Sequence, residues 1–394
     1  MPPTKDRNLE MRYLTSGESH GQCLNAIIEG FPSGVKIDEA FVNEQLAKRQ
    51  SGYGRGGRMK IETDTVKVLS GLRFGVTTGA PICLEIENKD WKNWTIPMSP
   101  TPISEENQPL ADSKKITALR PGHADLAGAK KYNHDDIRNI LERSSARETT
   151  TRVAVGAFAQ TLLNHFGIEI FSHVTQIGSV KAPEQTQTFE EIRLVAEKSE
   201  LRCADASAEQ KMKDLIDQIK EKGDSLGGYF GIIITNAPIG LGSFVHWDRK
   251  LDGLLAQAVM SIPAVKSVEI GAGVKAAELQ GSTMHDEIKK GLKRPTNNAG
   301  GIEGGMSNGE PIIIKAAMKA IPTMMTPLRS VDLATREEHL AHVERADVCA
   351  VPACAIVAEA MAANVLADLF LQKFGGDSLH EIEANFKNYL EQIK

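Results

Sequence analysis

The sequence predicts an α+β fold in which two similar halves are built from short strands and a smaller set of helices. Short apolar runs lie between glycine-rich loops, and the chain has 34 glycines among its 394 residues. Longer segments with helical periodicity alternate with these runs, so helices accompany the strands. A twelve-residue segment that begins at Gly71 also resembles one that begins at Gly301, which indicates an internal repeat.

Strands are expected where apolar runs are short and are bounded by turn residues. In chain order they cover residues 12–15, 24–29, 66–70, 82–87, 168–176, 229–235, 266–270 and 312–315. Helices are expected where a longer periodic segment begins at a capping residue or ends at glycine. They cover 38–49, 125–133, 145–166, 250–261 and 353–374, with two surface helices within 181–224. Residues 91–114 are rich in Pro, Ser and Thr and predict a loop.

The internal repeat aligns residues 71–82 with residues 301–312. Five of the twelve positions are identical, namely three glycines, the proline and the final isoleucine. Each copy follows a Pro-x-Gly loop, a helix and a Val-Lys strand, and each precedes an Ala-Asp loop and a long helix. We infer halves over about 1–170 and 228–394, an insertion over about 177–227, and a single domain over 1–394. The alternative is that glycine-rich turns recur by chance.

Composition narrows the possible functions. Hydrophobic residues make up 41% of the chain, enough for a substantial core, and the net charge is −5. A negative net charge argues against nucleic acid or an anionic membrane as a partner. The five cysteines form no Cys-x-x-Cys pair, so they predict reduced thiols and neither a disulfide framework nor a metal site. No apolar run is expected to span a membrane, and the polar N-terminus is no evident signal peptide, so we expect a cytoplasmic protein.

The segment Glu142–Arg152 is typical of a helix N-terminus that binds an anion. Ser145 and Glu148 have the spacing of a capping box. Unpaired N–H groups and the helix dipole make such an end attractive to phosphate. Arg143, Arg147 and Arg152 add permanent positive charges. The alternative is an ordinary capped helix with arginines on its surface.

Two histidines lie in tight turns next to predicted elements. His20 stands in Gly17-Glu18-Ser19-His20-Gly21 after a strand, and His123 stands in Arg120-Pro121-Gly122-His123-Ala124-Asp125 before a helix. Histidine titrates near neutral pH, so either could transfer a proton, unless each is an incidental loop residue. Neither has metal-ligand spacing to another histidine. His339 and His342 lie three residues apart in a charged run and predict a solvated helical face.

Several loops are candidates for enclosing a ligand. The basic, glycine-rich segment 49–58 predicts a lid whose Arg49 and Arg55 exclude water, although it could also be a loose surface or RNA-contacting loop. The segments 297–306, 319–323 and 345–347 are weaker candidates. Gly271–Ala276 fits a dinucleotide fingerprint but has no clear helix after it, and no P-loop motif occurs.

Together these segments resemble the chorismate synthase family. The matching pieces occur in the expected order along nearly the whole chain: Gly17–Gly21, Gly52–Glu62, Arg120–Asp125, Glu142–Arg152, Gly300–Gly309 and Arg345–Pro352. The resemblance implies a β-α-β sandwich of two sheets with helical layers, an internal pseudo-two-fold repeat and a homotetramer. It also implies a carbon–oxygen lyase that acts on a phosphate. This enzyme converts 5-enolpyruvylshikimate 3-phosphate to chorismate by anti-1,4-elimination, the last step of the shikimate pathway and part of aromatic amino acid biosynthesis.

The family requires reduced FMN although the reaction has no net redox change. Breaking an allylic C–O bond while an unactivated ring proton is removed needs a transient electron source, which a reduced flavin supplies. NAD(P)H is then needed only indirectly, to reduce the flavin, and we expect an external flavin reductase to do so. The remaining alternatives are a flavin- or nucleotide-dependent oxidoreductase and a non-catalytic protein that binds a phosphorylated ligand.

The resemblance also implies roles for individual residues. His20 protonates the departing phosphate, His123 maintains the protonation state of the reduced flavin, and Asp347 helps to remove the ring proton. Substrate or nucleotide binding is expected at Arg49, Arg55, Arg120 and Arg147. FMN contacts are expected at Arg143, Ser144, Ser145, Ala264, Gly304, Lys319, Ala320, Ile321, Pro322, Thr323 and Arg345. The chain departs from some members at Pro263, Ala320 and Ile321, so backbone contacts, not side-chain roles, are expected there.

Overall fold

The first half of the chain forms a four-stranded antiparallel sheet. The computed structural model describes residues 10–56, 63–184, 186–344 and 347–394. The strand order is β1 (Arg12–Ser16), β2 (Cys23–Glu29), β6 (Ile82–Glu87) and β3 (Val66–Ser70). Leu24, Ala26 and Ile28 alternate with more exposed residues along β2, so one face of this sheet is buried. The predictions for 66–70 and 82–87 are confirmed to the residue.

Strands of the second half join two strands that precede residue 228 to form a five-stranded sheet with a matching order of strands. It runs β10 (Val265–Ile270), β13 (Ile312–Met318), β9 (Gly228–Thr235), β7 (Glu169–Ile177) and β8 (Val180–Lys181), and neighbours are antiparallel. Without β8, the chain order of the strands across this sheet is that of the first sheet. Each sheet also has a bulge at one equivalent strand pair, in β3 after Val68 and in β10 after Val265.

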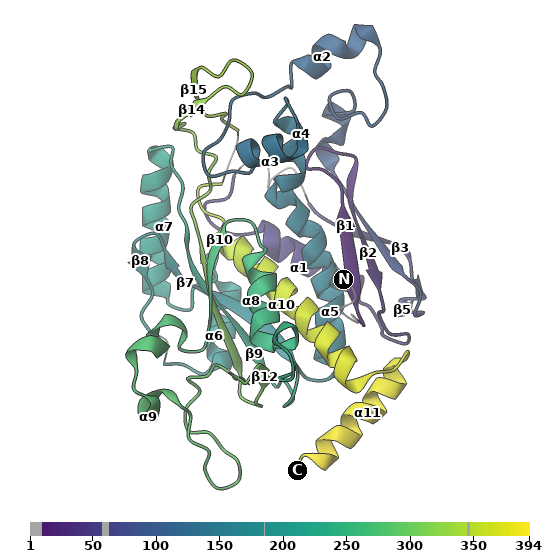
Figure 1. Ribbon diagram of the computed structural model, residues 1–394, viewed down its shortest axis with the longest axis vertical. Coiled ribbons are helices and arrows are strands. Elements are labelled where there is room, and N and C mark those ends of the chain that lie inside the picture. The colour runs from purple at the N-terminus through teal and green to yellow at the C-terminus, as the bar shows by residue number, and fades with distance from the viewer. Residues whose placement is uncertain (1–9, 57–62, 185, 345–346) are drawn as a thin grey trace.

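Two long helices lie between the sheets and form the centre of the core (Figure 1). Helix α5 (Thr149–His165) contacts β2, and α10 (Val351–Phe374) contacts β7 and β9. The two helices pack closely, because a Cβ atom added at Gly156 would lie only 2.3 Å from Cβ of Ala360. Helices α1 (Glu39–Gln50) and α8 (Leu251–Met260) contact α10 as well, and Asp38 caps α1 as predicted.

Helix α10 corrects the expectation that no segment is apolar and long enough to span a membrane. It has 24 residues, and its most apolar 18-residue stretch has a mean hydropathy of 1.8, so it passes that test by length and composition. However, 94% of its most apolar window is buried inside the fold. A helix that is hydrophobic all round is expected at the centre of a large core, and α10 occupies such a place.

The two repeat segments make the same hydrogen bonds in the two halves. In the first, Oγ1 of Thr77 donates to the carbonyl of Pro32 and accepts from the N–H of Val35. In the second, Oγ of Ser307 donates to the carbonyl of Pro238 and accepts from the N–H of Leu241. The hairpins β4 (Leu72–Arg73)–β5 (Val76–Thr77) and β11 (Ile302–Glu303)–β12 (Met306–Ser307) contain these residues. The aligned segments therefore occupy equivalent local environments.

The outer faces of the two sheets differ. Helices α6 (Phe189–Lys198) and α7 (Ala206–Glu221) belong to the insertion, and Ile192 of α6 packs with Phe171 and Ile233 on the second sheet. Figure 1 shows α6 and α7 on that side of the molecule. On the first sheet, the outer face leaves Leu14, Ile27 and Leu69 exposed.

Other elements were not predicted or were predicted wrongly. The segment expected as a loop contains the short helix α2 (Gln108–Asp112). Helices α4 (Arg138–Ser144), α9 (Gly281–Met284) and α11 (Leu379–Gln392) were missed, while α3 (Asp125–Tyr132) was expected. The helix proposed around His339 and His342 is wrong, because His339 lies in β15 (Glu338–Leu340), which pairs with β14 (Arg329–Val331).

Candidate functional site

A cavity of about 540 Å³ contains most of the residues that the sequence singled out. His20 comes from the turn after β1, and His123 comes from the turn before α3. The other predicted residues that line it are Arg49, Arg55, Arg120, Ser144, Ser145, Arg147, Ala264, Lys319, Ile321, Pro322, Thr323 and Asp347. Both halves of the chain therefore contribute to one site.

The turn that presents His20 depends on Gly17. Its φ is +102°, and a Cβ atom there would lie 2.4 Å from the carbonyl oxygen of Cys23, so no side chain fits. Nδ1 of His20 lies 2.9 Å from Oε1 of Glu142, and the backbone N–H of His20 donates to Oε2 of the same carboxylate. The ring also stacks on Trp94, with centroids 4.1 Å apart. The imidazole is thus fixed by a carboxylate and by an aromatic face.

Glu142 is held as an anion. Its side chain is 1% exposed, and Arg138 donates to Oε1 at 2.9 Å. Burial alone raises the pKa of Glu142, but hydrogen bonds from His20 and Arg138 outweigh that effect, so the pKa lies below its usual value. Arg138 also lies over the ring of Trp94, at 4.9 Å from its centroid, which ties this group together.

His123 is supported in the same way. Gly122 has φ +78°, which a side chain would strain, and it packs beside Lys319 and Pro322. Nδ1 of His123 lies 2.6 Å from Oδ1 of Asp125, whose carboxylate also accepts two hydrogen bonds from the Arg120 guanidinium at 2.9 Å each. Burial raises the pKa of Asp125, but hydrogen bonds from His123 and Arg120 hold it well below its usual range.

The predicted capping box at Ser145 forms only in part. Oγ of Ser145 accepts from the N–H of Arg147 and not from that of Glu148. The carboxylate of Glu148 pairs with Arg152. The reason is that a 3₁₀ turn (Ala146–Glu148) precedes α5, so the first turn is tighter than an α-helix requires. Ser144 and Ser145 still line the cavity.

Buried arginines and one carboxylate form the wall near α1. Arg147 pairs with the fully buried Asp64 and donates to Asn88 at 2.9 Å. Arg49 donates to Oγ1 of Thr149 and to the carbonyl of Ala146, whereas its Nη1 has no hydrogen-bond partner among the residues that the structure describes. Burial lowers the pKa of Arg49 to about 9, although the charge of Asp64 opposes that shift. Nη1 lies 3.8 Å from Oδ2 of Asp64, beyond hydrogen-bond distance, so its hydrogen-bonding capacity remains for a ligand oxygen.

The described part of the glycine-rich loop closes another side of the cavity. Nη1 of Arg55 lies 3.1 Å from Oδ2 of Asp347, and the N–H of Gly56 donates to Oδ1 at 2.6 Å. Tyr53 donates to Asp217 on α7, so the loop is also tied to the insertion. The rest of this loop, residues 57–62, lies outside the described residues.

The opposite wall combines apolar side chains with polar loop ends. Ile262, Met318 and Val357 line it beside Ala264, whose φ of +70° is unusual for a residue with a side chain. Such strain occurs most often at functional positions. Lys319 joins the two loops here, since its Nζ donates to the carbonyl of Gly122. A flat, partly apolar ligand could rest on this wall.

Three predicted FMN contacts among the described residues are not brought into this cavity, namely Arg143, Ala320 and Gly304. The guanidinium of Arg143 donates to the carbonyls of Thr15 and Gly17, so it supports the His20 turn instead. Ala320 is absent from the lining residues, and Arg345 lies outside the described part of the chain. Gly304 lines a separate pocket of about 500 Å³.

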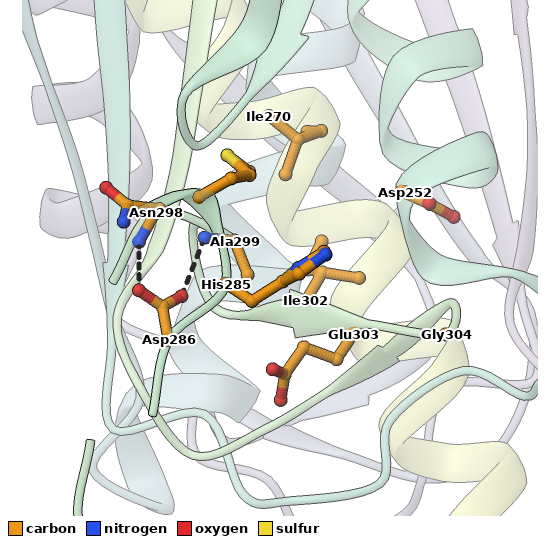
Figure 2. Close-up of a pocket in the computed structure, with 10 residues that line it drawn as sticks. Asp252, Ile270, His285, Asp286, Asn298, Ala299, Ile302, Glu303 and Gly304 are labelled. Atoms are coloured by element: carbon orange, nitrogen blue, oxygen red, sulfur yellow. Dashed lines mark hydrogen bonds between the residues drawn. The ribbon is translucent and has the colours of Figure 1, made fainter. Parts of the chain in front are cut away.

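Figure 2 shows this separate pocket, which His285, Asp286, Glu303 and Asp252 line. The carboxylate of Asp286 accepts from the backbone N–H groups of Asn298 and Ala299 at 2.8 and 2.9 Å (Figure 2). Asp286 is therefore committed to holding the loop that precedes β11. The predicted anion-binding arginines do not reach this pocket.

Sequence reasoning identified the two histidines but not the residues that hold them. Asp125 was visible as part of the His123 motif, and Glu142 opened the arginine-rich segment, but neither was assigned a role. Trp94 lay in a segment expected to be a loop, and Glu344, which also lines the cavity, had no signal in the sequence. A signal for Asp125 was available, because an acid two residues after a histidine in a tight turn can reach its Nδ1.

The fold and the cavity together define an α+β enzyme whose site holds two histidines and a set of arginines suited to an anionic substrate. Comparison with known proteins makes this class specific. The sequence profile of the family described as chorismate synthase matches residues 11–371. The chain belongs to the chorismate synthase family. Membership makes it a carbon–oxygen lyase of the shikimate pathway.

Individual relatives agree over nearly their full length. Chorismate synthase from Geobacter metallireducens is 53% identical over 98% of this chain and 99% of its own. The enzyme from Alkaliphilus metalliredigens is 55% identical, over 96% and 99% respectively. A crystal structure of chorismate synthase superposes with a TM-score of 0.78 at 41% identity and covers 98% of each chain.

Proposed function

We propose that this chain converts 5-enolpyruvylshikimate 3-phosphate to chorismate and phosphate in the cavity that contains His20 and His123. The reaction breaks the C–O bond to phosphate and removes a ring proton, so the site needs a proton donor, a proton acceptor and cations. The observation that carries the proposal is that both histidines, Asp347 and Arg49 line one cavity. A general acid typically contributes 10²–10⁴-fold to such a step.

Reduced FMN fits the residues present. The family uses reduced flavin, and this group supplies a transient source of electrons when bound. Ile262, Met318 and Val357 offer an apolar wall for a flat ring, and the strained Ala264 lies beside it. Ser144, Ser145 and the 319–323 loop would hold the remaining polar parts. The contacts expected from Arg143, Ala320, Gly304 and Arg345 stay predictions.

Residues of the chain itself are assigned separate roles in substrate binding and proton transfer. His20 delivers a proton to the departing phosphate. Arg49, whose Nη1 makes no hydrogen bond in the described structure and lies 3.8 Å from Oδ2 of Asp64, binds a substrate oxygen beside Arg147. Asp347 assists removal of the ring proton and is held by Arg55 and by the N–H of Gly56. His123, fixed by Asp125, maintains the protonation state that the reaction requires.

One assay separates this proposal from its two alternatives. The chain is incubated without oxygen with reduced FMN and 5-enolpyruvylshikimate 3-phosphate, and chorismate absorbance and free phosphate are both followed. Equal amounts of chorismate and phosphate support the elimination. Net reduction of a substrate with oxidation of NAD(P)H would instead indicate an oxidoreductase, and saturable binding without phosphate release would indicate a binding protein.

We also propose that flavin reduction depends on an external reductase and that NAD(P)H acts only through it. The one segment that fits a dinucleotide fingerprint, at 271–276, leads into a short 3₁₀ helix (Gly273–Glu278) and not into an α-helix. Chemically reduced FMN should support turnover where NADPH with oxidised FMN does not. Turnover with NADPH alone would contradict this part.

The assembly and architecture expected from the family are part of the proposal. The matched strand orders and the Thr77 and Ser307 hydrogen bonds support a single domain, built as a β-α-β sandwich with a pseudo-two-fold repeat. The exposed Leu14, Ile27 and Leu69 on the first sheet support burial of that face in a homotetramer, because contiguous apolar patches mark interfaces. Light scattering tests the assembly. The free cysteines fit a cytoplasmic location, which cell fractionation tests.

A further inference from the structure

The two histidine sites are built on the same plan. In each, Nδ1 of an imidazole contacts a buried carboxylate, and an arginine contacts that carboxylate. The two sets are His20–Glu142–Arg138 and His123–Asp125–Arg120. An ionised carboxylate can only accept a hydrogen bond, so Nδ1 of each ring is the donor, and the 3.1 Å approach of Arg120 Nη2 to Nδ1 of His123 is then not a hydrogen bond. Proton exchange with a ligand is then left to Nε2 of each histidine.

A third carboxylate lies between the two arginines. Oε2 of Glu344 is 3.9 Å from Nη1 of Arg120, and Oε1 is 3.8 Å from Nη2 of Arg138. The side chain of Glu344 is 30% exposed and lines the cavity. Burial raises its pKa, but His342 at 3.4 Å and the charges of Arg120 and Arg138 outweigh that effect, so the pKa lies below its usual value. Glu344 is therefore an anion at neutral pH.

The charges of the group show what Glu344 contributes. Glu142, Asp125 and Glu344 carry three negative charges, and Arg138 and Arg120 carry two positive charges. The group has a net charge of −1 when both imidazoles are neutral, and it becomes neutral when one of them is protonated. Without the charge of Glu344, the group is already neutral with no proton on either ring.

We propose that Glu344 is a positioning residue that couples His20 to His123 through Arg138 and Arg120 and favours one proton shared between the two sites. The inference rests on the roles proposed above for the histidines. Glu344 touches neither ring among the contacts described. It acts on each through an arginine and a carboxylate.

Other charged groups around the site also contribute to the electrostatic potential at the two histidines. Lys114 lies over Trp94 on the His20 side, and Lys319 lies beside Gly122 on the His123 side. Arg49, Arg147 and Asp64 form the far wall, with the Arg55–Asp347 pair next to them. Glu344 is distinct from these groups, because it contacts the arginines of both histidine sites.

Three substitutions test the proposal. Glu344→Gln removes the charge and keeps the size, Glu344→Asp keeps the charge, and Glu338→Gln on the exposed strand β15 removes the same charge away from the site. We expect E344Q to move the alkaline limb of the kcat/KM profile to lower pH by roughly 0.5–1 unit, because a negative charge that favours the imidazolium is lost. E344D should keep most of the wild-type profile, and E338Q should not change it.

A second measurement does not depend on turnover. The histidine Cε1 resonances of the full chain, assigned with His20→Gln and His123→Gln, report the pKa of each ring. We expect E344Q to lower the pKa of both rings, and to reduce the effect of His20→Gln on the pKa of His123. If E344Q loses activity while neither the pH profile nor either ring pKa changes, Glu344 is only structural and the proposal is wrong. If the ring pKa values shift but the chain forms no chorismate, the coupling stands and the proposed function fails.

Discussion

His20 and His123 lie in the same cavity, and each contacts a carboxylate, but the two carboxylates lie at very different sequence separations from their histidines. The carboxylate that holds His123 is two residues away, in the same turn. The carboxylate that holds His20 is 122 residues away, on α4. The ring of His20 also stacks on Trp94, whereas the ring of His123 contacts the guanidinium of Arg120. One site is therefore fixed by local geometry and the other by the tertiary fold.

A third histidine, His173, has a cation and not a carboxylate as its charged neighbour, and its pKa shows the consequence. His173 lies in β7, is 9% exposed, and has the cation Arg202 as its charged neighbour. Burial, and then the charge of Arg202, lower its pKa to about 4. A buried histidine beside a cation thus remains neutral, whereas His20 and His123 each contact a carboxylate.

The largest expected effect comes from removing the two imidazoles. His20→Ala and His123→Ala should each lower kcat by about 10²-fold or more, the scale of a lost general acid. The exposed His165, paired with Glu383, offers a matched control, and His165→Ala should leave kcat unchanged. The rate is measured with chemically reduced FMN present. Near-normal rates for either variant would remove that histidine from the mechanism.

Substitution of Arg49 should separate binding from proton transfer. Arg49 contacts neither histidine in the described hydrogen bonds, and its Nη1 makes an ion pair with Asp64 at 3.8 Å but no hydrogen bond. Arg49→Ala should therefore raise KM for the substrate by about 10–100-fold, as expected for a lost charged hydrogen bond of about 1.5–3 kcal/mol. Arg55→Ala should also mainly weaken substrate binding. Arg12→Ala, at an exposed pair with Glu29, is the control. An unchanged KM in the Arg49 and Arg55 variants would argue against their role in closing the site.

We expect His173 to make the free energy of unfolding depend on pH. Its folded-state pKa of about 4 lies below the unfolded value of about 6.5, so the unfolded chain binds the proton more strongly between these values. Stability from the neutral ring is complete above pH 6.5 and is lost as pH falls toward 4. At pH 5 the loss should be about 2 kcal/mol. Urea unfolding at pH 7 and pH 5 should show a smaller difference for His173→Gln than for wild type. Equal differences would mean that His173 does not titrate in this way.

The smallest effect is expected at Trp94. Its ring stacks on His20 and makes a cation–π contact with Arg138, but it supplies no proton to the reaction. Trp94→Leu should lower kcat by only about 2–5-fold, consistent with a loss of roughly 0.5–1 kcal/mol from a cation–π contact. The pKa of His20 should change in this variant by more than that of His123. A loss as large as that of His20→Ala would show that the stack is essential for placing the imidazole.

The sequence predicts the strands of this fold well because their signals are local. The run at 82–87 alternates with period two, the run at 66–70 does so up to the bulge after Val68, and both end at turn residues. The structure has strands with those bounds. The 3₁₀ turn at Ala146–Glu148 was missed because its sequence also fits an α-helical cap. Helix α11 was missed although Ser378 and Glu381 form a full capping box before it. His339 was assigned to a helix because β14 and β15 are too short to have a clear period.

Prediction of the site from the sequence was likewise limited to features encoded locally. The motif around His123 contains its own carboxylate, so its geometry follows from the local sequence. The pairing of Glu142 with His20 needs α4 to lie against the turn after β1, which no spacing in the sequence specifies. Glu344 is harder still, because its place depends on Arg120 and Arg138 together. Residue types were predictable, whereas contacts between distant segments were not.

The most direct test is a crystal structure of the chain with FMN and 5-enolpyruvylshikimate 3-phosphate bound. We predict that both ligands occupy the cavity between the two histidines, with Nε2 of His20 within about 3 Å of an oxygen of the phosphate. Nη1 of Arg49 should contact the same substrate. Ligands found in the pocket lined by His285 and Asp286, or with His20 far from the phosphate, would contradict the account.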